Sequence, residues 1–305
     1  MGDLIAVTGA YGYIGKYIAG RLLSQGKQVI TLTNKQPGFN SSSDQIKKYP
    51  LDFTHPGALT AALSGVDTLY NTYWVRFNYG QMSFERAVAN TQTLLQSAKN
   101  AGVRRIVHLS VTNPTVDSAL PYYRGKALLE LYIQQSGLSY AIIRPSVVFG
   151  FEDILMNNIA FLLRHSPVFA IPGSGQYRLQ PIYVEDLANI ALQAGASEQN
   201  QVIDAVGPDI FSFDALVHLI SEAIDSNSWI IHLPPGLALF LSQVIGFLVK
   251  DIVLTKDELR GLMAELLISN QPPLGNTSIR VWLAANAKVF GVKYASELHR
   301  HFSTK

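Results

Sequence analysis

The chain begins with a strand-like run, LIAVT (residues 4–8), which leads directly into the glycine-rich sequence GAYGYIG (residues 9–15). Three of its glycines, Gly9, Gly12 and Gly15, are spaced three residues apart, and a helix-like run follows them. Glycine is needed where a chain turns sharply from strand to helix and where its backbone approaches a pyrophosphate closely. The first amides of the helix then face the phosphates. The stretch therefore predicts a dinucleotide-binding turn rather than a packing turn without a ligand, with contributions from Thr8, Gly9, Tyr11, Gly12, Tyr13, Ile14 and Gly15.

Strand-like and helix-like runs alternate through the first 145 residues, which is typical of βαβ units and of a parallel sheet covered on both faces. After residue 150 the pattern is less regular. We therefore expect an α/β protein with a doubly wound parallel sheet of the Rossmann type in residues 1–150. Residues 151–305 are expected to form mainly a smaller substrate-capping region, with some segments returning to the first domain. The expected strands are 4–8, 28–33, 67–72, 104–110 and 139–144, and the expected helices are 14–25, 82–100, 122–135, 157–165 and 184–194.

Composition excludes several classes of function. Of the 305 residues, 48% are hydrophobic and only 15% are charged, against about 25% in an average soluble protein, so the chain can bury a large core. The net charge is +2 and there is no basic arm, which gives nucleic-acid binding no support. Cysteine is absent, which excludes a disulfide framework and thiol catalysis, and the histidines show no metal-ligand spacing. The first residues lack a signal-peptide pattern, and we expect a cytoplasmic protein.

The end of the second expected strand bears on the choice of cofactor. A dinucleotide domain that prefers NAD usually carries an acidic residue there. Here the strand ends in Asn34-Lys35, without a carboxylate. Lys35 would meet the 2′-phosphate of NADP, with a solvated loop lysine as the equally weighted alternative. NADP is thus the preferred cofactor, with NAD possible.

A tyrosine and a lysine, Tyr122 and Lys126, are four residues apart at the start of an expected helix and share one face of it. A free tyrosine has a pKa of about 10, and a nearby ammonium lowers it, so Tyr122 could act as an acid or base near neutral pH. This spacing is common by chance, but its context favours a site. Ser110 and Thr112 follow the strand 104–110, at the sheet edge where open α/β folds bind ligands. Either hydroxyl could bond a substrate carbonyl or alcohol.

Together these motifs resemble the short-chain dehydrogenase/reductase superfamily in its extended or atypical branch, over essentially the whole chain. Residues 172–175 and 180–188 resemble the second-half signature of that branch. Residues 110–114 and 122–126 resemble most closely the group of the 39-kDa-type subunit of respiratory complex I and related epimerase/dehydratase proteins. The resemblance implies further sites: Asp52, followed by Phe53, at the adenine; Asn71, Thr72 and Tyr73 under the adenosine ribose; Thr112 polarising substrate; Tyr122 as proton donor; Lys126 on the nicotinamide ribose; and Pro145 and Val148 beside the nicotinamide.

Two departures from the family pattern concern the substrate side. The small pair usual after the fourth strand is replaced by Thr72-Tyr73-Trp74, whose bulk would narrow the substrate site. Arg124-Gly125 precedes Lys126, where the family commonly has a small hydroxyl residue. Both departures leave the catalytic geometry open.

These features predict an NADP-preferring oxidoreductase or epimerase/dehydratase that acts on a small carbonyl, an alcohol or a sugar-nucleotide-like substrate. Tyr122 would move the proton, and Lys126 and a hydroxyl of Thr112 or Ser110 would assist. Two alternatives stay open. The protein would hold a dinucleotide as a structural or assembly element, as the complex I relative does, or it would act as a redox-sensing regulator.

Residues 229–249 are strongly apolar. A membrane-spanning helix needs about 20 apolar residues, and Pro234-Pro235 interrupts this run, leaving 236–249. We expect a core helix or a homodimer contact there, with contact to a membrane surface as the remaining alternative.

Overall fold

The computed structural model describes residues 2–35 and 45–302, with side chains as far as residue 299. The chain forms two compact units. The first comprises Met1–Pro145 and Val184–Ala205, and the second comprises Ser146–Tyr183 and Val206–Lys305. The division expected at residue 150 lies close to the first of these boundaries, and the segment from Val184 to Ala205 returns to the first unit.

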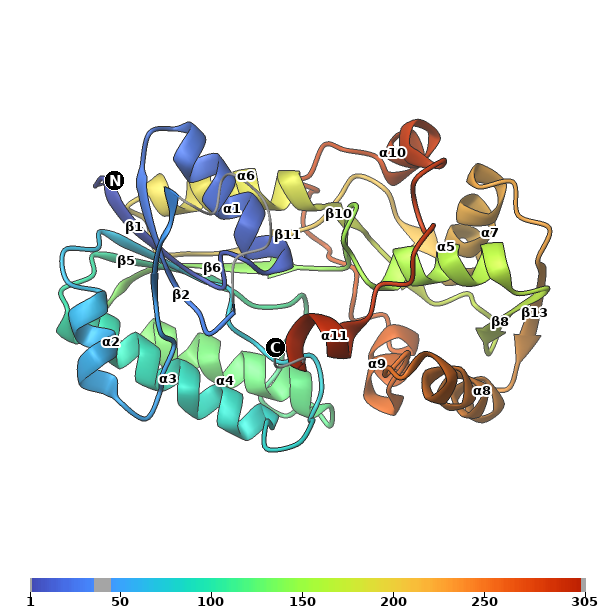
Figure 1. The fold of residues 1–305 in the computed structure, drawn as a ribbon, viewed down its shortest axis with the longest axis horizontal. Coiled ribbons are helices and arrows are strands. Elements are labelled where there is room, and N and C mark those ends of the chain that lie inside the picture. Colours follow the sequence, from blue (N-terminus) through green and yellow to red (C-terminus); the bar gives the residue numbers. More distant parts are fainter. Residues whose placement is uncertain (1, 36–44, 303–305) are drawn as a thin grey trace. The chain divides into compact units, whose positions relative to one another are not determined.

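The first unit is built on one parallel sheet of seven strands in the order β11-β6-β5-β4-β1-β2-β3 (Figure 1). From β1 the chain proceeds through β2 to β3 at one edge, then returns to β4 on the other side of β1. Strand order therefore reverses between β1 and β4, and open α/β sheets bind ligands outside such a switch point. The expected doubly wound sheet of the Rossmann type is confirmed. The strands are β1 (Leu4–Thr8), β2 (Gln28–Leu32), β3 (Lys47–Tyr49), β4 (Thr68–Asn71), β5 (Arg105–Leu109), β6 (Ser139–Pro145) and β11 (Gln201–Ala205).

Helices cover both faces of this sheet because its central strands are apolar on both sides. Helices α1 (Tyr13–Ser24) and α6 (Val184–Ala196) cover one face, and α2 (Pro56–Ala62), α3 (Phe84–Asn100) and α4 (Pro121–Gln135) cover the other (Figure 1). The Ser83 hydroxyl accepts a hydrogen bond from the amide of Arg86 and so caps the start of α3. After α1, α3 and α4 the chain turns at Gly26, Gly102 and Gly137, whose φ angles of 75°, 77° and 75° favour glycine.

Three elements of this unit were not expected from the sequence. Strand β3 is only three residues long and reads KKY, without an apolar run. Helix α2 has seven residues and begins at Pro56, which is favourable at a first helical position. Strand β11 pairs with β6 from Gln201↔Ala141 to Ala205↔Pro145, so its place depends on a partner 60 residues away. Short length or distant pairing removed the periodic signal in each case.

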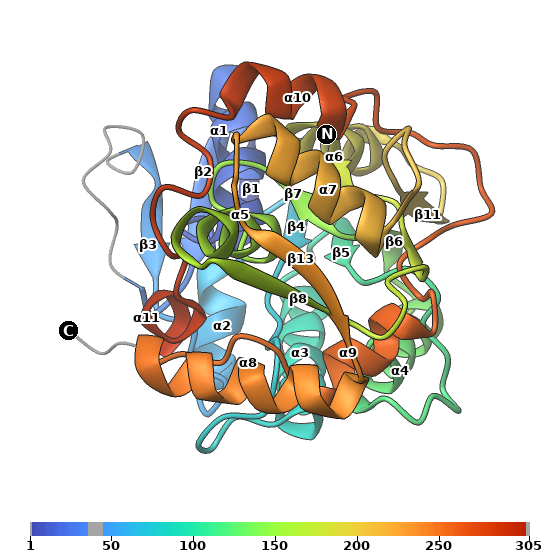
Figure 2. The ribbon, with the colours of Figure 1, turned by 90° about the vertical axis from the view of Figure 1, so that its right-hand side faces the viewer.

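The second unit packs short strand pairs and helices around its own apolar core. The core includes Phe149, Leu179, Leu216 and Leu283, all fully buried. Strands β8 and β13 pair in parallel, with α8 below them and α5 and α7 above them in Figure 2. The elements are β7 (Val148–Phe149), α5 (Leu155–His165), β8 (Val168–Pro172), β9 (Arg178–Leu179), β10 (Ile182–Tyr183), β12 (Phe211–Ser212), α7 (Phe213–Ala223), β13 (Trp229–Leu233), α8 (Pro235–Val249), α9 (Lys256–Met263), α10 (Ile279–Asn286) and α11 (Glu297–Phe302).

Helix α8 corrects one expectation for the apolar run 229–249. Its buried residues are only Ala238 and Gly246. Many of its large apolar side chains are exposed: Leu237, Phe240, Leu241, Val244, Phe247 and Leu248. The prediction of a core helix is therefore wrong, because an apolar composition does not by itself bury a residue. Contact of this run with a membrane surface or with a second copy stays a prediction. Among the described residues, no helix has both the length and the apolar character needed to cross a bilayer.

Candidate functional site

In the glycine-rich turn, the start of α1 packs closely against the main chain at Gly9. Gly9 has a φ of 65°, a region that side chains other than glycine rarely adopt. A Cβ built on Gly15 would lie 2.2 Å from the Gly9 carbonyl oxygen. The amide of Gly12 donates to that same oxygen at 2.7 Å, and α1 starts directly after Gly12. The first turn of α1 thus lies against the end of β1, with its amide ends at the sheet edge, where an anion would be stabilised.

Thr8 ties the end of β1 to the loop that follows β4. Its hydroxyl donates to Asn71 Oδ1 at 3.0 Å and accepts from the amides of Thr72 and Tyr73 at 2.8 and 3.2 Å. The Thr72 hydroxyl returns a bond of 2.6 Å to the Thr8 carbonyl. Four residues expected at the dinucleotide, Thr8, Asn71, Thr72 and Tyr73, therefore form one network at the switch point.

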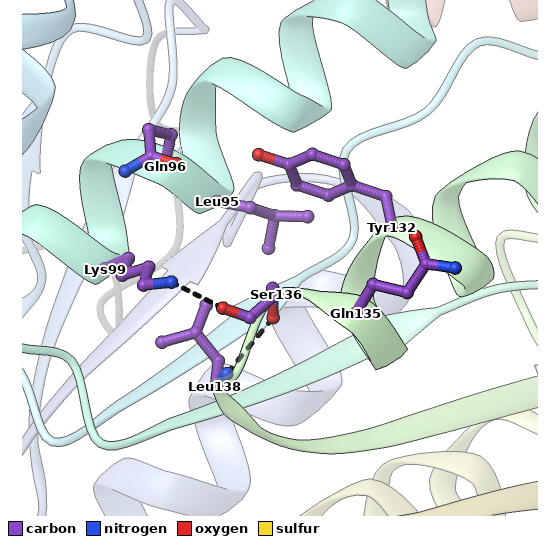
Figure 3. A pocket seen from close by; sticks show the side chains of 7 residues that line it. All are labelled: Leu95, Gln96, Lys99, Tyr132, Gln135, Ser136 and Leu138. Atoms are coloured by element: carbon purple, nitrogen blue, oxygen red, sulfur yellow. Dashed lines mark hydrogen bonds between the residues drawn. The ribbon is translucent and has the colours of Figure 1, made fainter.

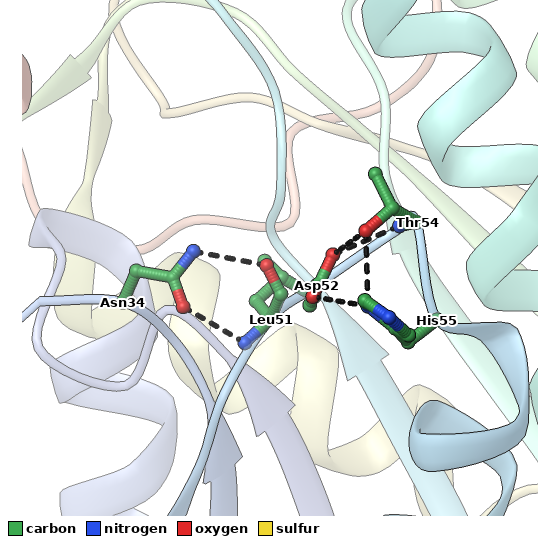
Figure 4. A network of polar contacts seen from close by, with 5 residues as sticks. All are labelled: Asn34, Leu51, Asp52, Thr54 and His55. Carbon is green, nitrogen blue, oxygen red and sulfur yellow. Dashed lines mark hydrogen bonds and ion pairs between the residues drawn. The ribbon is translucent and has the colours of Figure 1, made fainter.

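The residues expected at the adenosine end lie after β2 and β3. Asn34 joins these two strand ends, because its side chain bonds both the carbonyl and the amide of Leu51, at 2.9 and 3.1 Å (Figure 4). Asp52 accepts from the Thr54 hydroxyl at 2.6 Å and from the Thr54 amide at 2.9 Å, and it contacts His55 Nδ1 at 2.7 Å. These bonds, led by that of the Thr54 hydroxyl, lower the pKa of Asp52 to about 2, so it carries a negative charge at neutral pH. The role of Asp52 at the adenine stays a prediction.

Phe53 and Tyr73, expected in separate parts of the cofactor site, are in contact. Their ring centroids are 4.9 Å apart. Asn90 of α3 donates through Nδ2 to the Tyr73 hydroxyl at 2.9 Å and so fixes the ring. The loop after β4 is therefore held by α3 as well as by β1.

Lys126 is buried in α4, with 3% of its surface exposed. Its ammonium donates to the Leu109 carbonyl oxygen at the end of β5 at 2.7 Å, and it lies 4.5 Å from the centre of the Trp74 ring. Burial lowers the pKa of Lys126 to about 7, against the attraction of Glu130, which raises it. A lysine of this kind is charged only below about neutral pH, which is less favourable for tuning a phenol than the fully charged ammonium assumed from the sequence.

Tyr122 belongs to a small aromatic cluster with Trp74 and Phe84. Its ring meets both of them edge-on at 5.9 Å, while Trp74 and Phe84 stack at 6.1 Å. Phe84 and Val75 are buried at the centre of this cluster. The bulk expected after β4 is therefore placed directly against the Tyr122–Lys126 pair. This close packing is the structural consequence of the Thr72-Tyr73-Trp74 sequence.

The two hydroxyls predicted at the substrate have different surroundings. The buried Ser110 hydroxyl donates to Glu130, which also receives a two-pronged ion pair from Arg144, with Nε–Oε1 and Nη2–Oε2 distances of 3.0 and 2.5 Å. Thr112 is fully buried, and its amide donates to the carbonyl of Pro145 at 3.1 Å, at the end of β6. Ser110 is thus engaged in a buried polar cluster, and catalytic roles for either hydroxyl stay predictions.

The last residue predicted at the nicotinamide, Val148, lies in the second unit. It starts β7 and pairs there with Ile182 of β10. Of the residues predicted in the glycine turn, Tyr11, Tyr13 and Ile14 are half-buried at the start of α1. Lys35 is half-buried after β2, where its amide donates to the Thr33 hydroxyl at 3.1 Å.

Sequence reasoning missed His108, which is fully buried in β5. Asn71 Nδ2 lies 3.0 Å from His108 Nδ1, so this histidine extends the network from Thr8. Burial, with the nearby charge of Lys126, holds the pKa of His108 well below its usual value, and the ring is neutral. Its Nε2 is buried without a hydrogen-bond partner in the described part of the chain. A histidine inside the apolar strand RIVHL was the one signal that could have revealed it.

A cavity of about 270 Å³ lies between α3 and α4, away from these residues (Figure 3). Lys99 reaches across it to the Ser136 carbonyl at 2.6 Å, and Leu138 bonds the Ser136 hydroxyl through its amide at 3.2 Å. None of the predicted site residues lines it. Over residues 2–35 and 45–302, no cluster of three or more histidine or acidic residues could hold a metal ion.

Residues 5–205 match the model of the NAD dependent epimerase/dehydratase family. The chain belongs to this family. The match covers the glycine turn, the loop after β4, the Tyr122–Lys126 pair and the strands that carry them. Family membership thereby confirms the resemblance inferred from the sequence motifs.

This chain is similar to proteins with different names. The Arabidopsis thaliana protein named NADH dehydrogenase (ubiquinone) 1 alpha subcomplex subunit 9, mitochondrial, is 22% identical over 88% of this chain and 72% of its own length. The Mus musculus protein of the same name is 26% identical over 80% of this chain, which spans 66% of the mouse protein. Among solved structures, triphenylmethane reductase of Citrobacter sp., complexed with NADP(H), has a TM-score of 0.74 at 17% identity, covering 93% of this chain and 99% of its own. This likeness shows the fold.

The glycine turn predicts opposite effects for two alanine substitutions in the same helix. Gly15→Ala places a Cβ 2.2 Å from the Gly9 carbonyl oxygen, so α1 must move, and we expect a loss of about 1–3 kcal/mol in the free energy of unfolding. Gly20→Ala meets no atom within 4 Å and should gain up to about 1 kcal/mol from helix propensity. Chemical denaturation of both variants measures the difference. Equal effects would contradict the close approach of α1 to the turn.

The buried lysine predicts a pH-dependent effect of Lys126→Met. Because the pKa of Lys126 is about 7 in the folded protein and about 10.4 in the unfolded chain, the unfolded chain binds more protons between these values. The lysine therefore costs stability increasingly as pH falls from about 10 to 7. Lys126→Met should therefore be more stable relative to wild type at about pH 6.5 than at pH 9: the free energy of unfolding of the variant minus that of wild type should be larger at the lower pH. A pH-independent difference between the two proteins would show that Lys126 keeps an ordinary pKa.

Proposed function

We propose that this protein binds a nicotinamide dinucleotide at the carboxyl ends of β1 and β4, with its pyrophosphate at the start of α1. The observation that carries this proposal is the turn from Gly9 to Gly15, which brings bare main chain and the positive end of α1 to the switch point of the sheet. The first turn of α1 carries no acidic residue that would repel a phosphate. The family description names NAD, and the Citrobacter sp. structure holds NADP(H), which supports a cofactor of this class.

The reaction proposed is that of an oxidoreductase or an epimerase/dehydratase acting on a small carbonyl, an alcohol or a sugar-nucleotide-like substrate. The dinucleotide supplies hydride transfer when bound. Tyr122 would exchange a proton with the substrate oxygen, and the Thr112 hydroxyl would orient that oxygen. Lys126 would assist the proton transfer, because its charge lowers the pKa of the Tyr122 phenol. The half-exposed Tyr122 and the buried Lys126 on one face of α4 support these roles.

NADP is the cofactor we propose in preference to NAD. The turn after β2 carries Asn34 and Lys35 and no carboxylate. The two hydrogen bonds between the Asn34 side chain and the Leu51 backbone tie the residue before Lys35 to the segment after β3, which supports a defined place for Lys35. A lysine there would favour the additional phosphate of NADP.

A second function is favoured by a specific contact. The Lys126 ammonium donates a hydrogen bond to the Leu109 carbonyl and is covered by the Trp74 indole, rather than being exposed to solvent. Such an arrangement suits a protein that holds a dinucleotide without turnover, as a structural, assembly or redox-sensing component. The names of the Arabidopsis and mouse relatives support this alternative.

Dinucleotide binding and turnover, measured separately, distinguish these functions. Calorimetry should show NADPH binding to wild type, and no binding of NADPH or NADH at millimolar concentration would refute the central proposal. With carbonyl substrates, Tyr122→Phe should lower kcat by about 10²–10⁴-fold if Tyr122 is the proton donor. Tyr132→Phe removes a hydroxyl from the same helix outside the site and should leave kcat unchanged. Tight binding without turnover across a broad substrate panel would favour the structural role.

The cofactor preference depends on one lysine. Lys35→Ala should raise the Kd for NADPH about 10- to 100-fold, because a charge-assisted bond to phosphate contributes about 1.5–3 kcal/mol. The Kd for NADH should change little. Lys99→Ala removes a positive charge from α3 and serves as the control for net charge. An equal loss of affinity for both cofactors would contradict the assignment of Lys35 to the 2′-phosphate.

A further inference from the structure

The Trp74 indole lies directly over the Lys126 ammonium. The ammonium of Lys126 has the indole face on one side, at 4.5 Å from the ring centre, and the Leu109 carbonyl oxygen at 2.7 Å. A cation is attracted both to the face of an indole and to a carbonyl dipole. The lysine side chain has four rotatable bonds, and the two contacts together hold its ammonium in one place.

The backbone of α4 is shaped to receive this indole. A Cβ added to Gly125 would lie 2.9 Å from Trp74 Cη2 and 3.4 Å from Cζ2. The rim of the ring therefore rests on the one residue of α4 that has no side chain, directly before Lys126. Glycine inside a helix costs about 1 kcal/mol relative to alanine, so its presence here has a packing reason.

The same ring also contacts Tyr122. Trp74 meets it edge-on at 5.9 Å, and the indole also stacks with Phe84 at 6.1 Å. One loop residue after β4 is thus in contact with both members of the Tyr122–Lys126 pair. Its Nε1 is buried and has no hydrogen-bond partner among the described residues.

We propose that Trp74, packed on Gly125, is a positioning residue that holds the Lys126 ammonium against the Leu109 carbonyl and shields it from water. Its consequence for cofactor binding rests on the function proposed above. A charged Lys126 favours an anionic dinucleotide, so affinity should fall, by at most tenfold per pH unit, as the lysine loses its proton.

The direction of the effect follows from the surroundings of Lys126. The charged and titratable groups near it are Glu130 and Tyr122 on its own helix and His108 on β5, which is neutral. Burial is the largest cause of its lowered pKa, and the indole is a part of its cover. Replacing the indole by a smaller group removes the attraction of the ring for the ammonium, but it also admits water, which stabilises the ammonium. Because burial is the largest cause of the lowered pKa, the effect of water should prevail, and the titration of Lys126 should move to higher pH.

The primary test is a direct titration of Lys126 in the protein without cofactor, by NMR of ¹³C,¹⁵N-labelled lysine assigned through Lys126→Arg. Wild type should titrate near pH 7, Trp74→Leu at least about one pH unit higher, and Trp74→Phe close to wild type because it keeps an aromatic face. Phe84→Leu loosens the packing beside Trp74 but keeps the indole, so it should shift the titration less than Trp74→Leu does. An unchanged midpoint in Trp74→Leu would overturn the proposal, and so would equal shifts in Trp74→Leu and Phe84→Leu.

Cofactor binding then separates this proposal from the proposed function. If NADPH binds, its Kd should rise above about pH 7 in wild type and only at higher pH in Trp74→Leu. Superimposable pH profiles would overturn the positioning role while leaving cofactor binding intact. If no dinucleotide binds, the proposed function fails, and the NMR titration still decides the role of Trp74.

A thermal-unfolding cycle tests the fit between the indole and Gly125. In wild type, Gly125→Ala should lower the Tm, because the new Cβ meets the ring. In a Trp74→Ala background the same change should raise the Tm, because alanine favours the helix. A decrease of equal size in both backgrounds would contradict the packing of Trp74 on Gly125, and with it the proposal.

Discussion

The contact between the first turn of α1 and the main chain at Gly9 is the constraint on which the rest of the site depends. A Cβ on Gly15 would lie 2.2 Å from the Gly9 carbonyl oxygen, so the helix can approach the strand end only where both positions are glycine. This approach places the amide end of α1 at the point where strand order reverses. The same turn leaves Thr8 with its hydroxyl directed to β4, where it bonds Asn71 and the next two amides.

From Thr8 the constraint passes along the loop after β4. Thr72 and Tyr73 are fixed by β1 on one side and by Asn90 of α3 on the other. Trp74 follows them in the chain, and its indole is thereby delivered onto α4 at Gly125 and over Lys126. The glycine turn, which would hold the phosphates, and the lysine, which would meet the far end of the dinucleotide, are therefore linked through a continuous set of contacts.

Local signals in the sequence were sufficient for most of the first unit. The strand 4–8, the glycine spacing and the helices closed by Gly26, Gly102 and Gly137 each follow from a few adjacent residues. The sequence gives no signal where distant contacts decide: β11 depends on β6, and the Ser110 hydroxyl donates to Glu130, 20 residues away, which in turn pairs with Arg144. The apolar run of α8 predicts a core helix or a homodimer contact, because hydrophobicity measures the tendency to be buried. Burial itself depends on what packs against the helix, which the sequence does not show. The bulk of Trp74 was visible in the sequence, but its contact with Gly125 required the fold.

The charge state of Lys126, which is covered by the Trp74 indole, matters for both candidate functions. A tyrosine–lysine pair works as an acid–base group when the lysine is charged, since the ammonium is what lowers the pKa of a phenol. Burial beneath Trp74 makes that charge conditional on pH near neutrality. A bound dinucleotide brings negative charge to the site and would favour the protonated lysine, so occupancy and charge support each other. The same residues can thus serve a catalyst in which the cofactor completes the acid–base pair, or a holder in which protonation of one lysine strengthens retention of the nucleotide. The two differ in whether a substrate oxygen can reach Tyr122 past the rings of Trp74 and Phe84, and access to that hydroxyl is therefore the feature that separates an enzyme from a binding protein within this fold.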